Sequence, residues 1–208
     1  MIQSRTSVRF ILSPVPRVSE DHLIARREQI LAAARTCFLS KGLHNTSMQD
    51  LIQEAGLSVG AVYRYFKSKN EIISAIAGTV AGGIQQHIDA VADERLPLVE
   101  SLDLVLDGIE RQLEPDGSFS IALQVWGEAT LDPTISEIVR DRYTGVRRSV
   151  RRLVEHATEN GELPAGADID ATTAAVFALL PGYALQRVLI GVPDKPTYMT
   201  GVRALLGR

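Results

Sequence analysis

Cysteine is nearly absent from this sequence, with Cys37 the single one among 208 residues. A lone cysteine excludes a disulfide framework within the chain and a cysteine-based zinc site. Cys37 stands beside Phe38, so we interpret it as a buried structural residue rather than a redox sensor. The histidines at 22, 44, 87 and 156 show no metal-ligand spacing and no nucleophile beside them. The sequence therefore predicts no enzyme, no metal site and no cofactor.

Long apolar runs are also lacking. A membrane-spanning helix needs roughly 18 to 20 apolar residues, and the longest run here, 174–180, ends at Pro181 and Gly182. The apolar stretch at 10–12 is too short for the core of a signal peptide. We expect a cytoplasmic protein with no membrane partner. No alternating run of β-branched residues predicts a strand, so the expected fold is all-α.

The net charge of −3 hides an uneven distribution. Residues 1–70 hold ten Lys or Arg against five Asp or Glu, whereas the remainder holds twelve against twenty. A basic N-terminal part on an acidic body suggests that only the first part meets a polyanion such as DNA. The alternative is a chance distribution.

Three stretches of different character follow one another along the chain. Residues 1–19 are rich in Ser, Arg and Pro without periodicity, and we interpret them as a flexible arm. Residues 20–76 contain a helix and then short helical elements, and 77–208 contain longer helices separated by Pro and Gly signals. In this last part the pattern predicts helices near 97–113, 118–130, 133–159, 168–190 and 196–206.

The segment 46–69 has the anatomy of a helix-turn-helix. The pattern predicts a first helix at 47–55 with Thr46 as its N-cap, and Gly56 permits the tight bend because it adopts positive φ without steric cost. Ser58 caps a second, short helix that ends near Phe66. Ser68 and Glu71 then form a capping-box pattern that opens a longer helix to about residue 91.

The second helix of this segment carries the chemistry of DNA recognition. Its small N-terminal residues, Val59, Gly60 and Ala61, allow close approach to base edges. Arg64 is the side chain that could hold a guanine through two hydrogen bonds. Other residues can donate to phosphate oxygens: Thr46, Ser58, Tyr63, Tyr65, Lys67 and Lys69. The alternative is that the tyrosines simply pack against a neighbouring helix.

The same segment resembles the DNA-binding domain of the tetracycline-repressor (TetR/AcrR) family of bacterial regulators over about residues 26–76. One departure is Ile52, where that family usually has a small alanine. The resemblance rests on Thr46-Ser47-Met48, Leu51-Ile52, Ala55-Gly56-Leu57-Ser58, Gly60, Val62-Tyr63, Tyr65-Phe66, Ser68-Lys69 and Ile72. It implies phosphate contacts by Thr46, Ser58, Tyr65 and Lys69, and groove-facing positions for Val59, Gly60, Ala61, Tyr63 and Arg64.

The resemblance also implies what the rest of the chain does. It predicts a helical ligand-binding and dimerisation domain over 77–208, with the homodimer formed through helices near 133–159 and 168–190. The arginines along 140–152 bind an acidic ligand or DNA on one interpretation and form a solvated or rim face on the other. Candidate pocket residues, which could equally be ordinary core, are Phe119, Leu123, Trp126, Tyr143, Phe177 and Tyr183.

We therefore expect a sequence-specific regulator of transcription. The predicted partners are a double-stranded DNA operator, a second copy of the chain and an unknown small-molecule effector. A repressor released from a palindromic operator is the favoured form, with an activator left open. The rival interpretation is a helical binding or assembly module that no longer contacts DNA.

Overall fold

The computed structural model describes residues 20–113 and 117–207, and the arm expected at 1–19 lies outside this range. Over the described residues the chain is helical with no strand, so the all-α prediction is confirmed. The helices are α1 (Glu20–Lys41), α2 (Met48–Ala55), α3 (Val59–Tyr65), α4 (Lys69–Asp93), α5 (Leu98–Leu113), α6 (Ser118–Ala129), α7 (Pro133–Glu159), α8 (Ile169–Ile190) and α9 (Lys195–Leu205).

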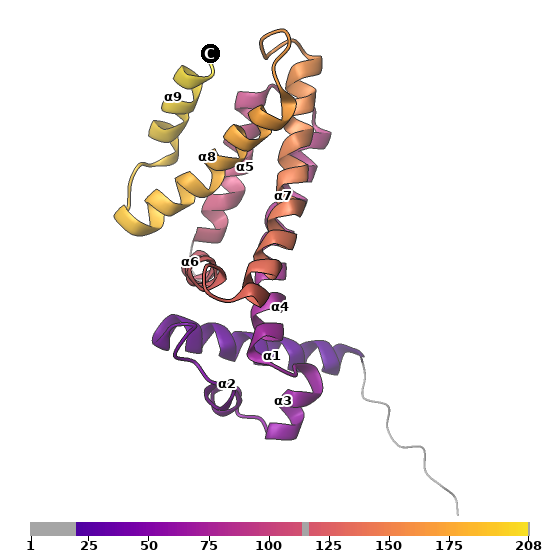
Figure 1. Cartoon of the computed structure of the whole chain (residues 1–208), viewed down its shortest axis with the longest axis vertical. Helices are drawn as coiled ribbons and strands as arrows, with labels where there is room; N and C mark the ends of the chain where they lie inside the picture. Colours follow the sequence, from indigo (N-terminus) through magenta and orange to yellow (C-terminus); the bar gives the residue numbers. More distant parts are fainter. Residues whose placement is uncertain (1–19, 114–116, 208) are drawn as a thin grey trace, which may run out of the picture.

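Helices α1, α2 and α3 form a small head at one end of the molecule, at the bottom of Figure 1. Helix α4 leaves this head and runs alongside α7 into the body, which comprises the rest of α4 and α5 to α9. The helix-turn-helix at the N-terminal end and the larger helical body thus have the expected arrangement.

The head closes around one apolar core. Its buried residues come from α1, from the α2–α3 unit and from the first turns of α4, such as Phe38, Leu51 and Ile72. The same core also contains Ile121 of α6 and Ile135 of α7. The head is therefore packed against the body and does not hang from a free linker.

Helix α4 belongs to two cores. Ile72, Ile73 and Ile76 are buried in the head core, while Ile88 and Val91 are buried in the core of the body. At the far end, Arg152 of α7 pairs with the carboxylates of Asp89 at 3.1 Å and Asp93 at 2.6 Å. One helix thus connects the head mechanically to the middle and the far end of the body.

The helix ends of the body follow clear local signals. Asp132 caps α7 by accepting from the backbone amides of Thr134 and Ile135, and Pro133 occupies the first turn, where no amide is needed. Asp168 caps α8 in the same way. These ends agree with the sequence prediction to within one residue. Helix α8 continues through Pro181, which lies inside it.

Helix α8 is unusually apolar for the amount of it that is covered. It is the one described helix long and apolar enough to cross a membrane by composition, and 28% of its most apolar window is buried. Its uncovered apolar side chains include Leu185, Leu189 and Ile190. An exposed apolar face of this kind is typical of a surface that meets another molecule.

Candidate DNA-binding surface and effector pocket

The first helix of the motif is fixed by a capping box. The Ser47 hydroxyl accepts from the Asp50 amide, and the Asp50 carboxylate accepts from the Ser47 amide at 2.8 Å. The N-cap is therefore Ser47, and the prediction of Thr46 was wrong by one position. Lys41 at the end of α1 also contacts Asp50 at 2.5 Å. This cation, followed by the Ser47 hydrogen bonds, lowers the pKa of Asp50 far below its usual value.

The turn and the second helix follow the sequence closely. Gly56 lies in the left-handed region at φ 63°, and its amide reaches back to the carbonyls that end α2. The Ser58 hydroxyl accepts from the Ala61 amide and so caps α3. Val62 and Phe66 are buried in the head core. The apolar side of α3 therefore fixes which of its residues face outward.

Four predicted groove-facing residues share one exposed face of α3. Val59 is 59% exposed and Tyr63 is 38% exposed, and Gly60 and Arg64 are exposed beside them. Ala61 is half-buried instead. Of the phosphate candidates, Ser58 is exposed, whereas Tyr65 is half-buried and packs against the head core. We call Val59, Gly60, Tyr63 and Arg64 the α3 face, and this exposed surface is the candidate for contact with a DNA groove.

Two further phosphate candidates are engaged inside the head. Thr46 is 2% exposed, and its hydroxyl donates to the carbonyl of Gly42 at 2.7 Å. The Lys69 ammonium donates to the carbonyls of Leu43 at 2.9 Å and Thr46 at 3.0 Å. The prediction for the Thr46 side chain is corrected because its hydroxyl is buried and satisfied. In this structure Lys69 holds the loop between α1 and α2 through these two hydrogen bonds.

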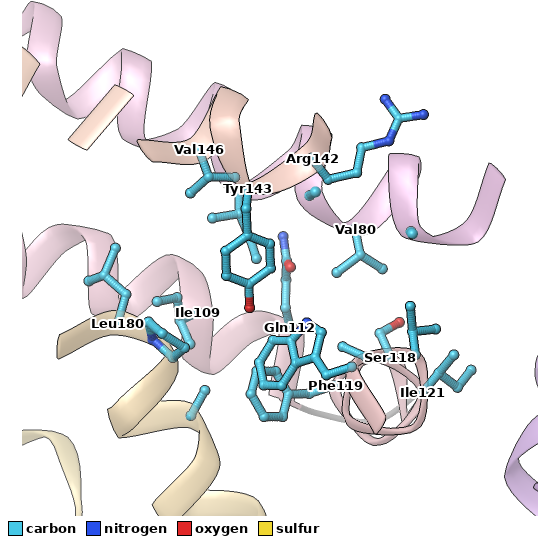
Figure 2. A pocket seen from close by; sticks show the side chains of 18 of the residues that line it. Val80, Ile109, Gln112, Ser118, Phe119, Ile121, Arg142, Tyr143, Val146 and Leu180 are labelled. Carbon is cyan, nitrogen blue, oxygen red and sulfur yellow. The ribbon is translucent and has the colours of Figure 1, made fainter. Parts of the chain in front are cut away.

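A pocket of about 120 Å³ lies inside the body, between α4, α5, α6, α7 and α8. Figure 2 shows its lining side chains converging on one space. Four of the six predicted pocket residues line it: Phe119, Trp126, Tyr143 and Phe177. Their rings form a continuous edge-to-face row with centroid separations of 5.4, 5.9 and 5.4 Å. Burial raises the pKa of the Tyr143 phenol, which therefore stays neutral.

The other two predicted residues lie elsewhere. Leu123 does not line the pocket, because α6 turns residues 118, 119, 121, 122, 125 and 126 toward it. Tyr183 is fully buried on another side of α8, where its hydroxyl donates to Glu110 and its ring packs against Tyr198 at 4.9 Å. Burial, followed by the Glu110 carboxylate, raises the pKa of Tyr183. Helices α6 and α8 both line the pocket, but Leu123 and Tyr183 lie on faces of these helices that do not.

Sequence reasoning missed the contributions of α4 and α5. Val80, Ala81 and Ile84 of α4 line the pocket, as does Gln112 near the end of α5. Gln112 lies three residues after Ile109 on the inward stripe of α5, so a polar residue on an apolar stripe was the available signal. Its Oε1 atom is buried and has no hydrogen-bond partner.

The helix-turn-helix, its exposed α3 face and the pocket in a separate helical body define a DNA-binding regulator. Residues 30–76 match the tetR family of bacterial regulatory proteins, and residues 98–206 match the C-terminal part of the BetI-type transcriptional repressors. The chain belongs to the tetR family and is a transcriptional regulator, not an enzyme. Proteins of this family bind DNA and ligands and act as dimers.

Individual relatives agree with this assignment. The transcriptional repressor Rv1474c of Mycobacterium tuberculosis is 32% identical over 57% of this chain, but the match spans only 65% of that relative. The transcriptional regulator UidR of Escherichia coli is 23% identical over 87% of this chain and 91% of its own length. The solved structure of GusR from Salmonella enterica superposes with a TM-score of 0.70 at 24% identity, covering 92% of this chain and 99% of GusR.

Proposed function

We propose that this chain is a homodimeric repressor that binds a palindromic operator and leaves it when a small molecule fills the pocket. The observation that carries the proposal is the course of α4. Ile72 and Ile76 of α4 hold the head core, and Val80 and Ile84 line the pocket on the same helix. A ligand that displaces α4 therefore displaces the α3 face.

Dimerisation is part of the proposal because the α3 face is small. One short helix reads few base pairs, and two copies related by a two-fold axis double the contact and require a palindromic site. The uncovered apolar side of α8 is the surface on which we place the partner, beside α7. Because its proposed partner is an operator in bacterial DNA, we also propose a cytoplasmic location.

The direction of control follows from differential binding. An effector releases DNA only if it binds the DNA-free arrangement of the heads more tightly than the DNA-bound one. To shift the protein from 99% bound to 99% free, the effector must bind the DNA-free arrangement about 10⁴ times more tightly than the DNA-bound one. Activation by the effector would require the opposite preference.

The test is binding of the purified protein to the DNA upstream of its own gene over a range of salt concentrations. We expect a footprint with two-fold symmetry and an affinity that falls steeply with salt, because phosphate contacts release counterions. Binding that is independent of sequence at every salt concentration would contradict the proposal. An asymmetric footprint occupied by one copy would contradict the dimeric operator.

A further inference from the structure

The effector pocket contains almost no charge. Among the described residues that line the pocket, Arg142 is the only one with a charged side chain, and none is an Asp or Glu. The Arg142 side chain is exposed and lies against Gly78 of α4, with its guanidinium 3.2 Å from where a Cβ of Gly78 would stand. Figure 2 shows this group directed away from the other labelled side chains. A charged ligand inside the pocket would therefore lose its hydration without gaining a partner.

Among the described lining residues, Oε1 of Gln112 is the one buried side-chain polar atom without a hydrogen-bond partner. Gln112 extends from α5 into the space between Tyr143 and Val80 (Figure 2), and its Nε2 atom is turned toward Gly83 of α4. A carbonyl oxygen can only accept a hydrogen bond. A buried acceptor without a partner destabilises the empty protein, so a ligand that donates here gains affinity from the same atom.

The volume of the pocket and the arrangement of its aromatic rings further limit which ligands fit. The volume of about 120 Å³ is close to that of an engineered cavity of about 150 Å³ that binds benzene. The pocket is bordered by Phe119, Trp126, Tyr143 and Phe177 in edge-to-face contact. Aromatic ligands pack well against such edges and faces.

We propose that the pocket takes an uncharged compound of about one aromatic ring that donates a hydrogen bond to Oε1 of Gln112. The proposal deepens the proposed function, because it assigns a chemical class to the effector of that site. A phenol is the simplest compound of this class. Toluene has nearly the same shape and lacks the donor, and benzoate and benzylammonium carry charge on the same ring.

The experiment measures binding of these four probes to the full-length protein without DNA. Trp126 is the only tryptophan and lines the pocket, so its fluorescence, excited where phenol does not absorb, reports occupancy. We expect phenol to bind more tightly than toluene once each affinity is corrected for transfer from water to an apolar solvent. Benzoate and benzylammonium should leave the fluorescence unchanged at concentrations where phenol saturates.

Two variants test the role of Gln112. Gln112→Met keeps the length of the side chain and removes the acceptor, so the ratio of phenol to toluene affinity should fall about tenfold. Ile84→Val trims the same pocket without touching the acceptor, and should weaken both probes equally. An unchanged ratio in Gln112→Met would overturn the proposal. If that variant does not fold, the corrected preference for phenol in the unaltered protein decides the question.

Other outcomes are equally decisive. Tighter binding of benzoate than of phenol would show that Arg142 selects an anion, and absence of binding by both neutral probes would exclude a one-ring site. Either result overturns the ligand class. Operator binding is measured separately on the same samples. Phenol that binds through Gln112 without releasing DNA would contradict the effector mechanism and leave the ligand class standing.

Discussion

The ammonium of Lys69 donates a hydrogen bond to the carbonyl oxygen of Thr46 at 3.0 Å. The family resemblance assigns both residues to phosphate contacts. In the structure, however, the side chain of each forms hydrogen bonds within the head. The second Lys69 hydrogen bond, to Leu43, fastens the start of α4 to the loop that precedes α2. The contact therefore orders the loop that leads into the motif.

Replacing Lys69 with Met should lower the stability of the protein. The carbonyls of two buried residues, Leu43 and Thr46, would lose a charged donor, and hydrogen bonds to charged groups contribute about 1.5–3 kcal/mol. Chemical unfolding measures the loss. Lys67→Met is the control, because the Lys67 side chain is exposed and its one hydrogen bond among the described residues goes to the Tyr63 carbonyl, which lies on the neighbouring helix turn. If Lys69→Met keeps full stability and only flattens the salt dependence of operator binding, Lys69 is a phosphate contact after all.

The two glycines of the motif should respond in opposite ways to alanine. Gly56 sits at φ 63°, a conformation that costs an L-residue roughly 1–2 kcal/mol, so Gly56→Ala should destabilise the protein by about that amount. Gly60 is helical and exposed, with open space around it, so Gly60→Ala should stabilise it by about 0.5–1 kcal/mol. Thermal unfolding of both variants checks the signs. Equal shifts would refute the left-handed turn.

How much of this site the sequence could predict depends on whether a residue's role is local. Gly56 and Ser58 act on their own turns, so their spacing alone predicted the end of α2 and the start of α3. Thr46 and Ser47 are adjacent hydroxyl residues, and only the fold shows that Ser47 caps the helix while Thr46 is buried. Propensity cannot separate two such neighbours.

Contacts between distant helices were harder to predict. The sequence identified aromatic pocket residues by type, which was correct for Trp126 and Tyr143, but the face of α8 that carries Tyr183 depends on how α5 and α9 pack against it. Gln112 was missed because one polar residue on the apolar stripe of α5 does not by itself show which neighbouring helices enclose it. The α4 lining was missed because small apolar residues resemble ordinary core.

The acid sensitivity of the head should depend on Asp50. Its pKa in the folded protein lies below the usual value of 3.8 because of the Lys41 cation and the Ser47 hydrogen bonds. A depressed carboxyl pKa stabilises the fold at pH values above 3.8, and this contribution is lost as the pH falls through the folded value. Asp50→Asn should therefore be less stable than the parent at neutral pH, with the difference shrinking in acid. Urea unfolding between neutral and strongly acidic pH measures it, and a constant difference would contradict the linkage.

Arg64 should contribute to operator affinity without contributing to stability. It is exposed on the α3 face and takes part in none of the ion pairs found among the described residues. Arg64→Ala should weaken operator binding by about 1–3 kcal/mol and relax preference at one base pair. Arg203→Ala removes an exposed arginine from α9, far from the head, and is the matched control. An equal loss of operator affinity in the two variants would show that Arg64 contributes only its positive charge and no contact with a particular base.

The apolar face of α8 should hold the two copies together. Leu189 is 64% exposed in the single chain, one turn after Leu185, and burying a leucine contributes about 1.5–3 kcal/mol. Leu189→Glu removes that burial and adds a carboxylate that must be desolvated, so the dimer should dissociate at concentrations where the parent remains paired. Sedimentation equilibrium measures the mass.

Leu131→Glu is the control, because Leu131 is 79% exposed between α6 and α7, away from α8. The monomeric variant should also lose operator binding, because each α3 face alone reads too few bases. A variant that stays dimeric places the interface on another surface.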